Sequence, residues 1–159
     1  MRFLKRFWRT LRGRWGRTPA DHAALPWPPV PGEPLSRYLL SKREFHRTRR
    51  TVNTSAFVPG QDGRKSVFRT LGLAEPDVWK LGQEKVVKPP HRLHARADVS
   101  VQVVYDAAVG LEADRPPSRH AELINWPDGE SARLLAATQL ADSAELHLNP
   151  SIYGQSTDW

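Results

Sequence analysis

A cluster of prolines constrains this chain more than any other sequence feature. Six of its fourteen prolines lie between Pro19 and Pro34, in the stretch PADHAALPWPPVPGEP. Proline has no backbone N–H and a fixed φ, so this window cannot form a helix and favours polyproline II. We therefore predict that residues 19–34 form a semi-rigid linker, with Trp27 docked on the domain or on a partner, and that the compact domain follows it.

The linker is preceded by a strongly basic segment. Residues 1–18 carry seven Arg or Lys and no acidic residue. At 100° per residue, the large apolar side chains share one face, which holds Phe3, Leu4, Phe7, Trp8, Leu11 and Trp15. This pattern predicts an amphipathic helix that docks on an anionic membrane surface, on nucleic-acid phosphates or in a groove of a partner protein. The alternative is a disordered leader, or one that is not part of the mature protein.

A second basic segment, KREFHRTRR at residues 42–50, holds five Lys or Arg. Phe45 and His46 alternate rings with the cations, which is typical of proteins that bind single-stranded nucleic acid, although a solvated basic loop would have the same composition. The candidate surface-binding residues of the two basic segments are Phe3, Phe7, Trp8, Trp15, Arg43, Arg47, Arg49 and Arg50.

The rest of the chain is acidic. Residues 71–159 carry eight basic and thirteen acidic side chains, so the net charge of +7 arises from the segments before them. The absence of cysteine excludes a disulfide scaffold, a thiolate nucleophile and a thiolate-ligated zinc. The sequence has no run of about 18 apolar residues, so it predicts no membrane-spanning helix. The leader also lacks the apolar core of a secretory signal. We expect a cytoplasmic protein, peripheral to the inner membrane if its leader binds lipid.

Hydrophobic periodicity predicts an α+β domain over residues 35–150, followed by a polar tail at 151–159. We expect a small mixed sheet packed with about three helices. Alternating apolar residues and strand formers predict short strands at 35–40, 52–58, 66–70, 120–124 and 146–148. A turn with one proline and two glycines separates the second and third of these strands and suggests that they pair as a hairpin.

Two of the helices have clear local signals. Pro76 fits the first turn of a helix that stops before Pro89. Asp128 is the expected N-cap of the last helix, whose apolar stripe includes Leu135 and Leu140.

The third helix, at residues 99–109, is less clear because its valines alternate as in a strand and also fit one helical face. Gly110 matches the left-handed residue that ends many helices. We therefore predict a helix there, with Asp98 or Ser100 as its N-cap.

Three segments resemble a set of small uncharacterised bacterial proteins. They are Ser66-Val67-Phe68-Arg69 with Gly72-Leu73, Ala95-Arg96-Ala97-Asp98-Val99, and Pro116-Pro117-Ser118-Arg119-His120-Ala121 with Trp126-Pro127. The resemblance covers about residues 36–145. It implies one domain unit and no particular activity.

Four residues are candidates for chemistry: Arg96, Asp98, Arg119 and His120. A histidine base, a carboxylate that orients it and arginines that hold a phosphate would suit nucleotide or nucleic-acid chemistry if they met at one edge of the fold. The interpretation that we favour is structural: Asp98 caps a helix and pairs with an arginine, and His120 makes a structural hydrogen bond. Since no known nucleotide-binding, nucleophile or metalloprotease motif is present, we expect no cofactor and no metal.

The sequence thus predicts a non-enzymatic interaction module for an unknown protein partner, with its basic leader docked on an anionic surface or on a partner. The alternative is a small enzyme that acts on a phosphate-containing substrate, either a nucleotide or a nucleic acid. Nucleic-acid binding through residues 42–50 is a third hypothesis. The sequence alone leaves open whether the domain is catalytic.

Overall fold

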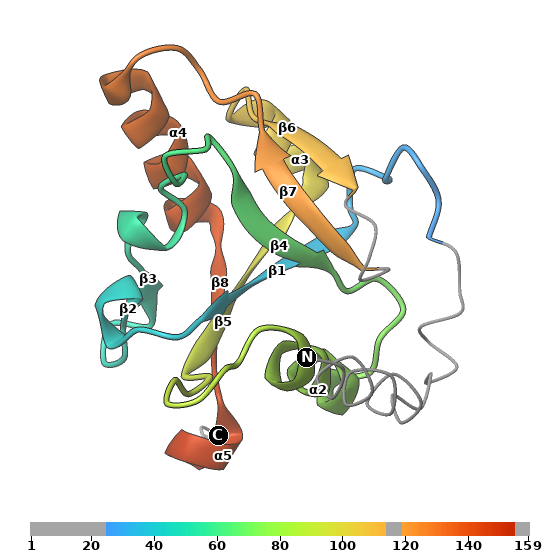
Figure 1. The fold of residues 1–159 in the computed structure, drawn as a ribbon, viewed down its shortest axis with the longest axis vertical. Coiled ribbons are helices and arrows are strands. Elements are labelled where there is room, and N and C mark those ends of the chain that lie inside the picture. Colours follow the sequence, from blue (N-terminus) through green and yellow to red (C-terminus); the bar gives the residue numbers. More distant parts are fainter. Residues whose placement is uncertain (1–24, 114–118, 155–159) are drawn as a thin grey trace, which may run out of the picture.

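The computed structural model describes residues 25–113 and 119–154. Six strands form a sheet in the order β6-β7-β4-β1-β5-β8, and every neighbouring pair is antiparallel (Figure 1). They are β1 Pro34–Leu39, β4 Lys65–Arg69, β5 Ala95–Ser100, β6 Gly110–Ala113, β7 His120–Ile124 and β8 Glu145–Leu148. A separate hairpin pairs β2 Phe45–His46 with β3 Thr51–Val52. The predicted α+β class is confirmed, with a sheet that is antiparallel throughout.

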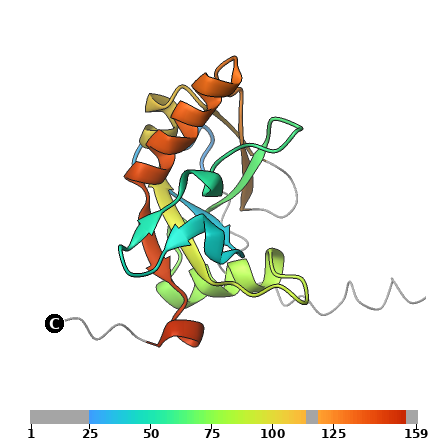
Figure 2. The ribbon, with the colours of Figure 1, turned by 90° about the vertical axis from the view of Figure 1, so that its left-hand side faces the viewer.

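The helices pack on both faces of this sheet. They are α2 Glu75–Lys85, α3 Val101–Asp106, α4 Glu130–Ser143 and α5 Pro150–Tyr153, with two 3-10 helices at η3 Lys42–Glu44 and η4 Thr54–Ala56. Figure 2 shows the hairpin beside β8, with α4 above it and α2 below. None of the helices in the described ranges is long and apolar enough to cross a membrane.

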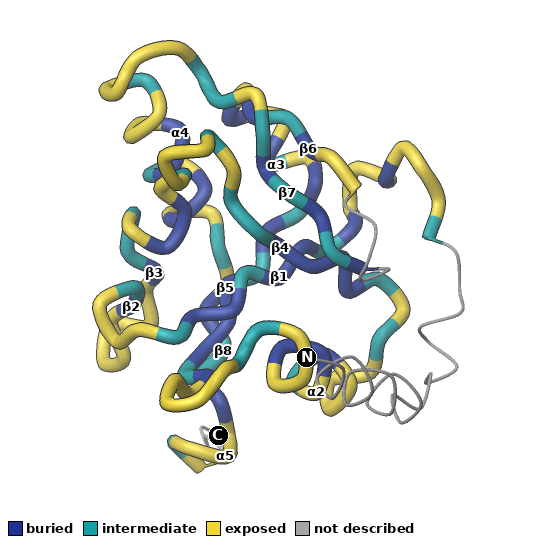
Figure 3. The backbone as a smooth tube through the Cα atoms, in the orientation of Figure 1, coloured by how far each residue is buried: buried dark blue, intermediate teal, exposed yellow. Residues whose placement is uncertain are grey.

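The two faces of the sheet differ in character because side chains alternate along each strand. One face packs against α3 and α4 in the larger apolar cluster, which includes Leu35, Leu39, Val67, Ala97, Val101, Val104, Leu123, Ala137 and Leu140. The other face packs against α2 through Tyr38, Phe68, Val78, Leu81 and Leu93. Around this smaller cluster the second face carries polar side chains, and we call it the polar face. In Figure 3 the central strands are buried and the hairpin turn is exposed.

The second half of the Pro-rich segment belongs to the domain. Glu33 is fully buried and accepts hydrogen bonds from Nε and Nη2 of Arg69, the latter at 2.8 Å. The same Nη2 donates to the carbonyl of Pro26 at 2.6 Å, and the guanidinium lies 5.7 Å from the ring centroid of Trp27. The predicted linker therefore ends before Pro26. Its first residues and the predicted leader lie outside the described residues.

The predicted helix at residues 99–109 is only partly correct. β5 continues to Ser100, and α3 begins at the next residue. The Ser100 hydroxyl accepts a hydrogen bond from the N–H of Val103, so one of the two proposed N-caps is confirmed. The left-handed residue after the helix is Ala108, with φ of 57°, and the predicted stop at Gly110 instead begins β6.

The predicted hairpin between residues 52–58 and 66–70 is wrong. Val52 pairs with Phe45, and the residues after it form η4. β4 pairs with β1 and β7, which lie far from it in sequence. Register between distant strands depends on the burial of both sheet faces, which a local turn signal does not report.

The ends of two C-terminal elements also differ from expectation. Gly129, with φ of 90°, is the N-cap residue of α4, and the side chain of Asp128 does not cap it. Leu135, placed in the apolar stripe, is 61% exposed, whereas Leu140 is buried as predicted. The segment expected to be a polar tail instead starts with the short helix α5. The side chain of Asn149 caps this helix by accepting a hydrogen bond from the N–H of Ser151.

Candidate binding groove

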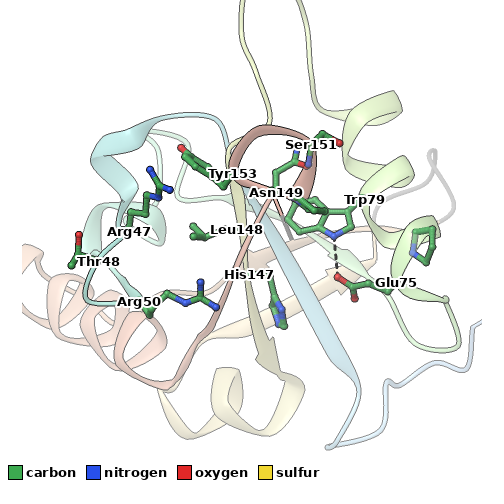
Figure 4. Close-up of a pocket in the computed structure, with 13 residues that line it drawn as sticks. Arg47, Thr48, Arg50, Glu75, Trp79, His147, Leu148, Asn149, Ser151 and Tyr153 are labelled. Carbon is green, nitrogen blue, oxygen red and sulfur yellow. Dashed lines mark hydrogen bonds between the residues drawn. The ribbon is translucent and has the colours of Figure 1, made fainter. Parts of the chain in front are cut away.

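A hollow of about 970 Å³ lies beside β8, the last strand of the sheet (Figure 4). Three segments line it: α2 with Glu75, Pro76 and Trp79; the end of β8 and α5 with His147 to Ser151, Tyr153 and Gly154; and the hairpin turn with Arg47, Thr48 and Arg50. A second hollow, of about 370 Å³, shares Arg47 and Tyr153 with the first and adds Lys42, Phe45, His46 and Asn53. We call the two adjoining hollows the β8 groove.

Local structure fixes the basic wall of the groove. Ser41 and Glu44 form a capping box around η3, which leads into β2. The tight turn that follows places Arg50 in a left-handed conformation, with φ of 56°. Arg47 lies over the ring of Tyr153, with Cζ 4.7 Å from the ring centroid, a cation–π contact that joins the turn to α5.

Arg96 lies on the polar face behind the groove, where it contacts two of the lining residues, Glu75 and Trp79. Its side chain is 3% exposed, and it donates to both carboxylate oxygens of Glu75, at 2.7 and 2.8 Å. Its Nε donates to Asp98 Oδ2 at 3.0 Å, and the ring of Trp79 covers the guanidinium at 4.6 Å. These hydrogen bonds from Arg96 hold the pKa of Glu75 below its usual value. The buried cation is thus shared between Glu75, which lines the groove, and Asp98.

Asp98 is held by two further groups, Ser36 and His147. It accepts from the Ser36 hydroxyl at 2.7 Å, and His147 Nε2 lies 3.3 Å from its Oδ2. The same His147 nitrogen lies 3.5 Å from Glu145 Oε1. Asp98 lies inside β5 and caps no helix, but its predicted pairing with an arginine is present.

The structure separates His120 from Arg96 and Asp98. Cross-strand pairing gives the row His120, Phe68, Ser36 and Asp98 over four adjacent strands. Three strand spacings amount to about 14 Å, and Phe68 stands between the two ends of the row. His120 Nε2 instead lies 2.5 Å from the Ser66 hydroxyl, the structural hydrogen bond that we favoured.

Arg119 also has a structural place. Its Nη1 donates to the carbonyls of Arg69 and Leu71, both at 3.0 Å, where β4 ends. The four candidates thus form one close pair, Arg96 with Asp98, and two separate groups. They do not converge around one substrate-sized space.

The surface-binding candidates also divide. Arg47 and Arg50 line the β8 groove, while Arg43 and Arg49 are exposed and are not among its lining residues. Phe45 is 6% exposed and packs in the larger apolar cluster, so its ring cannot serve as the base-stacking surface that the sequence suggested. The leader candidates Phe3, Phe7, Trp8 and Trp15 lie outside the described residues.

The groove residues that sequence reasoning missed include Glu75, Trp79 and His147. His147 had a usable signal, since it alternates with two leucines in a predicted strand and therefore points to the opposite face. Glu75 and Trp79 had none, because their contact with Arg96 joins segments about twenty residues apart.

Comparison of this chain with family models, curated proteins and solved structures found no match.

Proposed function

We propose that this chain is a non-enzymatic protein-interaction module, and that its β8 groove binds an acidic, extended segment of a partner protein. The balance of charge along the groove carries the proposal. Lys42, Arg47 and Arg50 line it, together with two histidines. The acidic side chain among the lining residues is Glu75, which is paired with Arg96, so positive side chains outnumber negative ones along the groove. Complementary charge of this kind speeds encounter and selects acidic partners.

The polar cluster behind the groove supports binding rather than catalysis. Arg96, Asp98 and Glu75 bond to one another with short, well-directed contacts. A general base must reach the proton that it abstracts, and the predicted base, His120, lies on another part of the sheet. This polar cluster therefore acts as a rigid support for the groove residues Glu75 and Trp79.

A nucleic-acid partner fits this groove less well than an acidic protein segment. Proteins that bind single strands combine cations with aromatic rings on which bases stack. Here Phe45 is buried, one face of Trp79 is covered by Arg96, and Arg47 lies over Tyr153. The rings in this region are thus already engaged with the protein's own side chains.

A titration of the full chain with fluorescein-labelled peptides tests the proposal. One pool contains twelve-residue peptides of Glu, Val and Thr in random order, and a matched pool has Gln in place of Glu. We expect fluorescence anisotropy to rise with the Glu pool at low salt and to fall again as salt screens the charges. Equal responses to the two pools, or no response to either, would refute the proposal.

We further propose that residues 1–18 hold this module on an anionic membrane surface, because their sequence pattern predicts a helix with apolar residues on one face and basic residues on the other. The test is flotation of the full chain with phosphatidylglycerol vesicles, compared with phosphatidylcholine vesicles. Phe7→Ser/Trp8→Ser should abolish flotation with the anionic vesicles. Leu134→Ser/Leu135→Ser, which removes two exposed apolar side chains of α4, is the matched control. If the leader variant still floats like the unaltered chain, the leader is not the anchor.

A further inference from the structure

We infer that the partner segment binds as an additional antiparallel strand along the outer edge of β8, with its main chain hydrogen-bonded to Leu148. This inference rests on the proposed function and names the form that the bound segment takes. It follows from three features: the position of β8 at the end of the sheet, the direction of its backbone groups, and the different side chains on the two sides of the groove.

β8 has a strand on one side only. It lies at the end of the sheet and pairs with β5 through four residues. The N–H of Asn149 donates to the carbonyl of His94 at 3.0 Å, so the backbone of this residue faces β5. Since backbone direction alternates along an antiparallel strand, the N–H and C=O of Leu148 face away from the sheet. Within the described residues, no other strand pairs with that edge.

This backbone edge opens into the groove. Leu148 is a lining residue, whereas Leu146, the other residue with an outward backbone, is 6% exposed and packs in the apolar cluster. The accessible edge is therefore short. An antiparallel hydrogen-bonded pair lets a single partner residue satisfy both backbone groups of Leu148, which suits an opening of this length.

The side chains around Leu148 specify the order of residues in the partner. Figure 4 shows Leu148 on the side of Arg47 and Arg50, and His147 on the side of Trp79. A partner residue paired with Leu148 would point its side chain to the same side, toward the two arginines. The residues before and after it would point toward Trp79. The preferred segment is thus an acidic residue between two apolar ones.

Main-chain chemistry also favours a peptide over a nucleic acid at this edge. Leu148 presents one donor and one acceptor side by side, and an extended peptide offers the complementary pair in every second residue. A phosphodiester backbone carries acceptors and no matching donor at that spacing. If nucleic acid binds, it would contact the arginines alone, and the backbone N–H and C=O of Leu148 would stay without a partner from the ligand.

N-methylated peptides give a direct test, with the full chain and a fluorescein-labelled Thr-Val-Glu-Val-Glu-Val-Thr probe. N-methylation of both Glu residues removes the N–H groups that would face Leu148, and should weaken binding by about tenfold or more. N-methylation of the central Val is the matched control, since its N–H would point away from β8. A peptide of the same composition with the three Val and the two Glu in separate blocks should bind less tightly than the alternating probe.

Hydrogen exchange at single amides provides the second readout. The Leu148 amide should exchange about tenfold or more slowly when the alternating probe is bound, while the exposed Gln61 amide should not change. If acidic peptides bind but N-methylation of Glu has no more effect than that of Val, and the Leu148 amide stays unprotected, strand addition is refuted while the proposed function survives. If no acidic peptide binds at all, the proposed function itself fails.

Discussion

Glu33 and Arg69 form a buried ion pair that ties the Pro-rich segment to the end of β4. The two side chains are 0% and 5% exposed, and two nitrogens of the arginine donate to the two oxygens of the carboxylate. A bidentate pair of this kind is geometrically specific, and breaking it leaves a charge without its partner inside the protein. The domain therefore starts upstream of the strand at which the sequence placed it.

Glu33→Gln should lower the free energy of unfolding by about 3–5 kcal/mol, because Arg69 would remain buried without a counter-charge. Urea denaturation measures the change. Glu84→Gln is the matched control, since its pair with Lys80 is exposed, and it should cost less than about 0.5 kcal/mol. Similar losses for the two variants would show that the buried pair contributes no more than a surface contact.

The contact between α2 and β1 leaves no room for a side chain at Gly82. A Cβ at this position would lie 2.5 Å from the ring of Tyr38, whose hydroxyl donates to the carbonyl of Val78 at 2.5 Å. Gly82→Ala should therefore destabilise the fold by about 1–3 kcal/mol despite the higher helix propensity of alanine. Gly32→Ala is the control, because a Cβ there meets nothing within 4 Å. A neutral or stabilising Gly82→Ala would contradict this packing.

Lys65 should make stability depend on pH in the alkaline range. Burial, followed by repulsion from Arg37, lowers the pKa of Lys65 to about 8, while nearby Glu44 acts in the opposite direction. The unfolded chain keeps the ordinary pKa of about 10.5, so it binds more protons between these two values. Below pH 8, Lys65 is charged in the folded chain, and the burial of this charge lowers the free energy of unfolding. Between pH 8 and 10.5 the folded chain loses this proton before the unfolded chain does, so the free energy of unfolding rises with pH.

Lys65→Met removes that titration and keeps an apolar side chain of similar length. The variant should be more stable than the unaltered chain at pH 7, and the difference should shrink as the pH approaches 10. Denaturation at both pH values measures the effect, with the exposed Lys88→Met as control. An advantage that is the same at both pH values would show that the charge of Lys65 carries no penalty.

The sequence predicted those strands and helices whose signals, such as side-chain alternation or a proline in the first turn, lie within the element itself. β1, β4, β7 and β8 follow alternation of side chains, and the start of α2 follows the preference of proline for the first turn. β5 was missed because it passes directly into α3, so that one run of valines serves two structures. The strand is distinguished from the helix by the pairing of Ala95 and Ala97 with β1, where both alanines are buried.

The site was less predictable than the fold for a related reason. Arg96 and Asp98 are two residues apart in a strand, so their shared face follows once the strand is known. Their contacts with Glu75 and His147 depend on the register of β8 and on the packing of α2. The pairing of β7, β4, β1 and β5 places His120 three strands away from Asp98, which no local pattern could show.

The most direct test of the central claim is the affinity of the β8 groove for the acidic peptide pool after charge reversal. Arg47→Glu/Arg50→Glu should weaken binding by roughly tenfold or more, because both cations line the groove. Lys88→Glu/Arg133→Glu makes the same change in net charge at exposed residues outside the groove and should leave the affinity nearly unaltered. Equal affinities for the two double variants, both close to that of the unaltered chain, would contradict the assignment of the groove as the binding site.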